Sequence, residues 1–135
     1  MCTYNGAAFL QQQLDSLVAQ TCRPDEVIIC DDCSQDQSVE IAQGFAKQHP
    51  DIAVKVVQNP QNLGYIKNFE KAISLCTQDI IFLCDQDDLW QPNKIENMVA
   101  VLDAEPSVGL VLHDFCWIDE RNQPYPGPID TYGPK

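Results

Sequence analysis

The chain has 135 residues, 8 of them basic and 20 acidic, so its formal net charge is −12. This length suits one domain with its own core, and the acidic balance argues against a nucleic-acid surface, which needs a basic stripe. No apolar run reaches the roughly eighteen residues of a membrane span, and no signal peptide is visible. Seven cysteines, four of them in or beside apolar runs, indicate a reduced compartment. We therefore expect a cytoplasmic protein, with the inner face of the membrane as an alternative location.

The hydrophobic pattern predicts alternating helices and strands. The first half of the chain predicts, in order, a helix at 7–20, a strand at 27–30, a helix around 41–46 with Ser34 or Asp36 as its cap, a strand at 54–57 and a helix at 66–76. The second half predicts a strand at 80–84, a helix over 90–103 with Pro92 in its first turn, and a strand at 108–112. This alternation predicts an α/β fold with a mainly parallel, doubly wound sheet and helices on both faces.

The two ends of the chain differ from this pattern. Residues 121–135 are rich in Pro and Gly without periodicity, which predicts a loop or a severed linker after a domain at 1–120. Residues 3–6 form a strand-to-helix turn with no predicted strand in front of it. We therefore expect a sheet that lacks its first strand, as in a truncated domain.

The acidic segment after strand 80–84 is the most informative motif. Asp85, Asp87 and Asp88 directly follow the apolar residues. Ligands of open α/β sheets bind beyond the carboxyl ends of strands, and alternation in an extended chain places Asp85 and Asp87 on one side. Two such oxygen donors could hold Mg²⁺ or Mn²⁺ together with substrate phosphates and water, and a chain this acidic needs a cation to accept a phosphate ligand. An acidic turn that caps the next helix is the alternative.

Four motifs, in this order, resemble the N-terminal, nucleotide-binding half of family 2 glycosyltransferases with the GT-A fold. They are Thr3-Tyr4-Asn5-Gly6, Ile28-Ile29-Cys30-Asp31-Asp32-Cys33-Ser34, Asn62-Leu63-Gly64 with Lys67-Asn68-Phe69, and Asp85-Gln86-Asp87-Asp88-Leu89-Trp90-x-Pro92-x-Lys94. The match runs from about residue 2 to residue 120, and implies that 1–120 is a nucleotide-sugar-binding domain. The last motif resembles that of bacterial rhamnosyltransferase-like members that build surface polysaccharide.

The resemblance implies a set of nucleotide-binding residues, namely Thr3, Tyr4, Asn5, Asp32, Asn62, Gly64, Lys67 and Asp85. Thr3 and Tyr4 would border the base, and Asp32 would accept a hydrogen bond from the ring N–H of uracil or thymine. A helix cap is the alternative for Asp32 and for its neighbour Asp31. A plain turn is the alternative for Asn62 and Gly64, and a solvated helical side chain for Lys67.

The resemblance also implies the reaction. Asp87 would ligate Mn²⁺ or Mg²⁺ at the diphosphate, and Asp85 would bind the metal through water or contact the ribose. The whole enzyme would transfer a sugar from UDP or dTDP, with inversion, to a hydroxyl of a growing glycan or lipid-linked glycan. No motif marks the base, although Asp114 and Asp119 are carboxylates near the end. A nucleotide-binding remnant without catalysis is the alternative function, and a homo-oligomer stays open.

Two departures from the family pattern lead to structural expectations. Position 33 is Cys where the family usually has Gly, so the turn is strained if it needs a positive φ. The absent first strand of the family lies between the strands at 27–30 and 80–84, whose edges would then be unpaired.

Other classes fit fewer residues. Cys30 and Cys33 have the spacing of a thioredoxin-like redox pair, but acidic neighbours would raise the pKa of the thiol, and a zinc site would need a second ligand pair. A signalling receiver domain also carries an acidic pair after a strand. Such a domain, however, opens with that strand, whereas here a whole helix precedes it.

Overall fold

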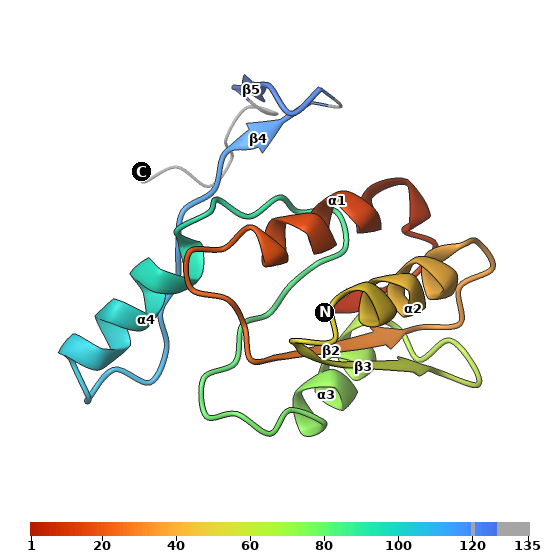
Figure 1. The fold of residues 1–135 in the computed structure, drawn as a ribbon, viewed down its shortest axis with the longest axis horizontal. Coiled ribbons are helices and arrows are strands. Elements are labelled where there is room, and N and C mark those ends of the chain that lie inside the picture. Colours follow the sequence, from red (N-terminus) through yellow and green to blue (C-terminus); the bar gives the residue numbers. More distant parts are fainter. Residues whose placement is uncertain (120, 127–135) are drawn as a thin grey trace. The chain divides into compact units, whose positions relative to one another are not determined.

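The computed structural model describes residues 1–119 and 121–126. The chain divides into two compact units at the boundary between Ala100 and Val101, and each unit is described by itself. The first unit holds β1 (Cys2–Thr3), α1 (Ala7–Val18), β2 (Glu26–Asp31), α2 (Ser38–Gln48), β3 (Ala53–Gln58), α3 (Tyr65–Ser74) and most of α4 (Lys94–Ala104). The second unit holds β4 (Trp117–Ile118) and β5 (Pro124–Tyr125). Figure 1 shows these elements in chain colours.

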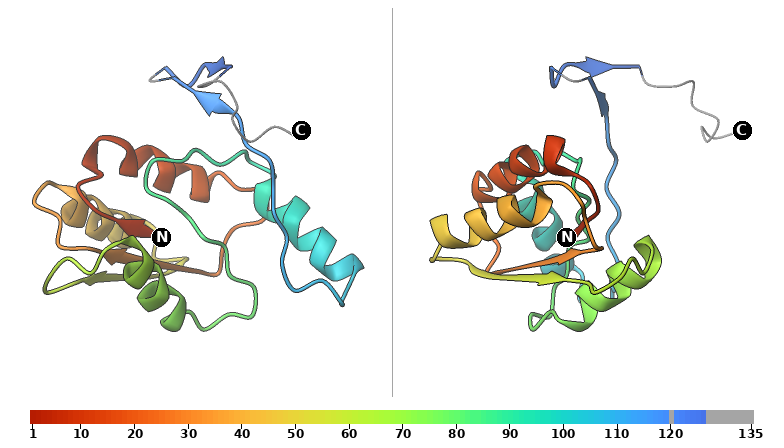
Figure 2. Two further views of the ribbon diagram at one scale, coloured as in Figure 1. Left: turned by 180° about the vertical axis from the view of Figure 1, so that it is seen from behind. Right: turned by 90° about the vertical axis from the view of Figure 1, so that its right-hand side faces the viewer.

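The sheet of the first unit is parallel and has the order β1-β2-β3. Five of the six residues of β2 are buried, because both faces of this central strand are covered. Side chains alternate across a strand, so Val27 and Ile29 pack with α1 and α2, whereas Ile28 and Cys30 pack with α3. Figure 2 shows α1 and α2 on one face of the sheet and α3 on the other. The predicted α/β fold with helices on both faces is confirmed.

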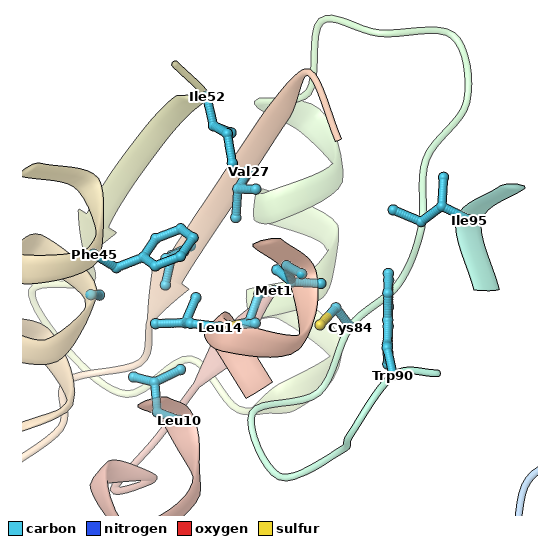
Figure 3. Packing of buried hydrophobic residues seen from close by; sticks show 12 residues of the cluster. Met1, Leu10, Leu14, Val27, Phe45, Ile52, Cys84, Trp90 and Ile95 are labelled. Carbon is cyan, nitrogen blue, oxygen red and sulfur yellow. The ribbon is translucent and has the colours of Figure 1, made fainter. Parts of the chain in front are cut away.

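The larger core lies between the sheet and α1 and α2. Leu10, Leu14 and Phe45 are almost fully buried there and contact the residues of β2 that point to that face. Trp90 and Ile95 extend this core from the segment that follows the acidic motif (Figure 3). The helical spacing of Leu10, Leu14 and Leu17 in the sequence predicts this face of α1.

Two predicted strands are wrong. Residues 80–84 and 108–112 have no strand structure. The end of the first segment meets the sheet at Cys2, whose N–H donates to the carbonyl of Cys84 at 3.3 Å and which forms a bridge with Asp85. A strand needs a neighbour for its backbone groups, and β1 offers only two residues. The expected absence of the first strand also needs correction, because β1 pairs with Cys30 and Asp31 of β2 and leaves that part of the β2 edge paired. This short strand lies between β2 and the chain at Asp85, where the family's first strand was expected.

The predicted helix boundaries also need correction. The helix predicted over 90–103 begins at Lys94, so Pro92 lies in the turn before it rather than in its first turn. Gln37, not Ser34 or Asp36, is the residue at the N-cap of α2. Asp36 still acts at this helix end, since its carboxylate accepts hydrogen bonds from the N–H of Ser38 at 3.0 Å and from the N–H of Ala7 at 2.9 Å.

The second unit contains a short hairpin in which β4 and β5 pair antiparallel. The carboxylate of Asp119 accepts hydrogen bonds from the N–H groups of Arg121 and Gln123, both at 2.8 Å, and so shapes the turn. Pro124 therefore lies in a strand, although the sequence predicts a loop from 121 onward, and the rest of that predicted tail, 127–135, lies outside the described residues. Within the described residues, no helix is both long enough and apolar enough to cross a membrane.

Candidate functional site

The polar motifs of the sequence meet at the carboxyl ends of the parallel strands. The N–H of Asp32, after β2, donates to the carbonyl of Thr3, in β1, at 2.8 Å. The N–H of Asn59, after β3, donates to the carbonyl of Asp31 at 2.8 Å. The bridge between Cys2 and Asp85 brings the acidic segment to the same edge. Ligands of open α/β sheets bind at such an edge, so this is the candidate site.

Thr3 and Asp31 form a buried pair under the first turn. The Thr3 hydroxyl donates to the Asp31 carboxylate at 2.9 Å, and the N–H of Ser34 donates to the same carboxylate at 2.9 Å. Thr3 is 2% exposed and Asp31 is fully buried, whereas Tyr4 is 50% exposed. Of the first motif, the ring of Tyr4 therefore offers surface to a ligand, and Thr3 supports the turn.

Asn5 and Cys33 both have positive φ at the two turns of the site, with φ values of 48° and 70°. Asn tolerates this region, and Asn5 also ties the turns together, because its side-chain oxygen accepts the N–H of Gln35 at 2.8 Å. Cys has no such compensation. The strain expected for Cys33 at a positive φ is therefore confirmed.

The Asp32 carboxylate joins three parts of the chain at this edge. Its two oxygens accept the Asn59 side-chain amide at 2.8 Å, the N–H of Leu63 at 2.8 Å and the N–H of Gly64 at 2.9 Å. The residue is only 3% exposed. Desolvation acts to raise the pKa of Asp32, but the hydrogen bonds from Leu63, Asn59 and Gly64 outweigh it, so the pKa lies below its ordinary value of 3.8.

Asn62 and Gly64 form the turn that Asp32 holds. The side-chain nitrogen of Asn62 donates to the backbone carbonyl of Asp32 at 3.3 Å, and its oxygen accepts the N–H of Gly64 at 3.0 Å. Gly64 has φ of 80° and precedes the first residue of α3, so a residue with a side chain would be strained there. This turn therefore sets where α3 begins.

Of the two lysines on α3 near this turn, Lys71 reaches the network and Lys67 does not lie in it. The Lys71 ammonium donates to the side-chain oxygen of Asn59 at 2.7 Å, and its charge helps to lower the pKa of Asp32. Lys67 is exposed. The sequence motif indicates Lys67, while Asn59 and Lys71 carry no motif signal and were missed.

The acidic loop presents three exposed carboxylates, those of Asp85, Asp87 and Asp88. Partial burial, and then the charges of Asp88 and Asp87, raise the pKa of Asp85 above its ordinary value. In the described part of the chain, no three acidic, His or Cys side chains converge as a complete metal-binding group. A cation bound by Asp85 and Asp87 would therefore need to take its remaining ligands from phosphates and water.

Three buried polar residues on and just after α1 form hydrogen bonds with the chain at and after the acidic loop. They are Gln13, Ser16 and Gln20, which are 0%, 6% and 5% exposed. The Ser16 hydroxyl accepts the N–H of Trp90 at 3.2 Å, and the Gln20 amide donates to the carbonyl of Gln91 at 2.8 Å.

Gln13 extends this anchoring toward the acidic residues. We assign its amide so that the oxygen accepts from the Trp90 indole at 3.3 Å and the nitrogen donates to the backbone carbonyl of Asp88, because both atoms then have complementary partners. The sequence carries a weak signal for these polar residues, in that Gln13 and Ser16 lie on the same face as Leu10, Leu14 and Leu17.

Cys30 and Cys33 do not form a reactive pair. Cys30 is fully buried, and desolvation raises the pKa of its thiol, so the thiolate needed for redox chemistry is disfavoured. Both thiols are free.

One cavity of the first unit lies elsewhere. It has a volume of about 390 Å³ and is lined mainly by apolar residues of β2, α3 and the segment 78–84. None of Tyr4, Asp32 and Asp87 lines it. The candidate site is therefore the open strand edge and not this cavity.

The chain is a parallel α/β domain with polar loops and an acidic motif at the carboxyl ends of its strands. The model of the family described as "Glycosyl transferase family 2" matches residues 1–128. The chain therefore belongs to glycosyl transferase family 2.

Several curated relatives resemble the chain. An uncharacterized glycosyltransferase of Nostoc sp. is 31% identical over 132 residues, which cover 98% of this chain and 40% of that protein. The dTDP-rhamnosyl transferase RfbG of Shigella flexneri is 33% identical over 106 residues, which cover 76% of this chain and 36% of that protein. The chain thus spans about two fifths or less of the length of these relatives.

Solved structures also align with the chain over part of their own length. The mannosyltransferase PcManGT from Pyrobaculum calidifontis, in complex with GDP-Man and Mn²⁺, aligns with a TM-score of 0.74 and 31% identity over 80% of this chain and 32% of that one. TarS of S. aureus, in complex with UDP, aligns with a TM-score of 0.68 and 28% identity over 76% of this chain and 30% of that one. These likenesses confirm the predicted GT-A type of α/β fold.

Proposed function

We propose that this chain is the donor-binding part of a metal-dependent glycosyltransferase that moves a sugar from UDP or dTDP to a hydroxyl of a growing surface glycan. The observation that carries the proposal is the convergence of Tyr4, Asp32 and the acidic loop at one edge of the sheet. A base reader, an aromatic surface and carboxylates for a cation are the groups that a nucleoside diphosphate needs.

The base would lie between Tyr4 and Asp32. The Tyr4 ring is half exposed and can stack on a pyrimidine. The Asp32 carboxylate already accepts three hydrogen bonds, which leaves one acceptor position for the ring N–H of uracil or thymine. Its lowered pKa keeps it ionised at neutral pH, as an acceptor must be.

The diphosphate would lie toward Asp85 and Asp87. A divalent cation held by these carboxylates would neutralise charge on the departing nucleoside diphosphate. Asp87 is the proposed direct ligand, and Asp85 is proposed to bind through water or to contact the ribose. Lys71 lies in the hydrogen-bond network of Asp32, so Lys67 is the lysine of α3 left to reach for phosphate oxygens.

The similar proteins support both the type of donor and the cation. RfbG is named a dTDP-rhamnosyl transferase, and TarS was solved with UDP and with UDP-GlcNAc. PcManGT was solved with GDP-Man and Mn²⁺, which makes Mn²⁺ the first cation to test and GDP a necessary comparison. We propose Mn²⁺ or Mg²⁺ and a pyrimidine nucleotide, with a glycan or lipid-linked glycan as the acceptor and inversion at the sugar carbon.

Nucleotide binding without transfer is the second candidate. It is favoured by one observation: the groups gathered at this edge suit a donor nucleotide, while the carboxylate of Asp119 shapes the hairpin turn through one oxygen, which accepts two backbone N–H groups.

Binding and turnover together separate the candidates. Calorimetric titration of the chain with UDP, dTDP and GDP in the presence of Mn²⁺ should show binding of a pyrimidine nucleotide in preference to GDP. Release of free UDP from UDP-sugars, with and without added glycan, then tests transfer. Binding with acceptor-dependent release supports the glycosyltransferase, binding without release supports the second candidate, and no binding by a folded chain contradicts both.

A further inference from the structure

Gln86, the residue between Asp85 and Asp87, makes a two-point contact with the turn that carries Tyr4. The N–H of Tyr4 donates to its side-chain oxygen at 2.9 Å, and its side-chain nitrogen donates to the carbonyl of Tyr4 at 3.2 Å. A planar amide that bonds both backbone groups of one residue fixes that residue in position and in orientation. The contact joins parts of the chain 82 residues apart.

Gly6 provides the space for this contact. A Cβ atom on Gly6 would lie 2.0 Å from the side-chain oxygen of Gln86, so any larger residue expels the amide. Its backbone does not require glycine by conformation, because its φ of −105° is open to other residues. The absence of a side chain at position 6 is therefore explained by the approach of Gln86.

The contact leaves the ligand-binding groups free on either side. The backbone of Tyr4 is held while its ring stays 50% exposed, and Asp85 and Asp87 remain exposed next to Gln86. A cation that draws these carboxylates together would fix the loop, and through Gln86 it would also fix the turn of Tyr4. A nucleotide that orders the turn would fix the loop in the same way, because coupling between two sites is reciprocal.

We propose that Gln86 is a positioning residue that couples the two halves of the donor site, so that a divalent cation and a nucleotide each strengthen the binding of the other. This inference rests on the proposed function, since it assigns the nucleotide to Tyr4 and the cation to Asp85 and Asp87.

The test measures the affinity for UDP and dTDP with and without Mn²⁺ in the wild type, Gln86→Ala and Gly6→Ala. In the wild type, Mn²⁺ should raise the affinity; in both variants, that increase should shrink by about fivefold or more. The double variant should lose no more than either single one, because Gly6→Ala acts through Gln86. Gln91→Ala, an exposed glutamine of the following segment, is the matched control and should keep the full increase.

The outcomes distinguish a failure of the proposed function from a failure of the role proposed for Gln86. A folded wild type that binds neither nucleotide overturns the proposed function and this inference with it. Variants that keep the whole Mn²⁺-dependent increase overturn the inference alone. The same holds for variants that lose affinity equally with and without Mn²⁺, since that is the result of a merely structural role. Gly6→Ala alters no hydrogen-bonding side chain and keeps the test valid if Gln86→Ala fails to fold.

Discussion

The carboxylate of Asp32 accepts the backbone N–H of Gly64 at 2.9 Å and thereby ties the end of β2 to the start of α3. The neighbouring N–H of Leu63 donates to the other oxygen at 2.8 Å. The residue proposed to read the base is thus also the residue that shapes the adjacent loop. Any change at Asp32 will therefore affect stability as well as binding.

Asp32→Asn should lower the free energy of unfolding at pH 7 by about 2 kcal/mol, because charge-assisted hydrogen bonds to a buried carboxylate are lost. The pKa of Asp32 is lowered in the folded state, so its contribution is present above the ordinary value of 3.8 and is lost as the pH falls through the folded pKa. The difference in the free energy of unfolding between the wild type and the variant should therefore become smaller below about pH 4. Urea titrations from pH 3 to pH 7 measure it.

Asp25→Asn is the control for this experiment, because Asp25 is exposed and directly precedes the same strand. It should change stability by less than about 0.5 kcal/mol at every pH. A penalty for Asp32→Asn that stays constant down to pH 3 would contradict the role given to the ionised carboxylate.

Cys33→Gly should stabilise the chain. Cys33 has φ of 70°, a conformation that costs a residue with a side chain about 1–2 kcal/mol, while glycine loses part of this gain to the entropy of the unfolded chain. The net gain expected is about 0.5–1 kcal/mol, or roughly 2–4 °C in Tm. Cys33→Ala keeps the strain and should give no such gain in the same thermal melts. Equal effects of the two substitutions would mean that the thiol, and not the backbone, sets the stability.

Gln20→Ala should destabilise the acidic loop. The substitution removes the acceptor of the Ile95 N–H, at 3.1 Å, and one of the two donors to the Gln91 carbonyl, at 2.8 Å. The expected cost is about 2 kcal/mol in the free energy of unfolding, since both partners lose a hydrogen bond inside the protein. Gln12 is exposed on α1, so Gln12→Ala should leave the free energy of unfolding nearly unchanged. Hydrogen exchange at Trp90 and Ile95 should rise only in the Gln20 variant.

The sequence predicts the helices and strands that depend on a local hydrophobic pattern. It does not predict whether an apolar run forms a strand when that depends on a neighbouring strand. The helix at 7–20 and the strand at 27–30 were predicted within a few residues, because buried apolar spacing determines both. The apolar runs at 80–84 and 108–112 have the same composition as a strand, yet they form none. Strand formation depends on which backbone lies alongside, and that information is not in the run itself.

Some residues of the candidate site are indicated by sequence motifs, and others are found only in the structure. Motifs indicate Tyr4, Asp32 and the acidic loop, and the structure brings these to one edge of the sheet. The residues that were missed, such as Gln13 and Lys71, act through side chains whose partners lie outside their own helices. The motif indicates Lys67, which lies one helical turn from Lys71, and only the fold shows that Lys71 is the lysine that enters the Asp32 network.

The most direct test of the central claim is calorimetric titration of the chain with UDP and dTDP in Mn²⁺, for the wild type, Asp87→Ala and the control Asp79→Ala. Asp79 is another exposed aspartate, outside the acidic motif. The account predicts Mn²⁺-dependent binding in the wild type and in Asp79→Ala, and a loss of at least about tenfold in affinity in Asp87→Ala, which corresponds to about 1.4 kcal/mol. Equal binding by all three proteins, or binding indifferent to Mn²⁺, would contradict a donor site built on Asp87.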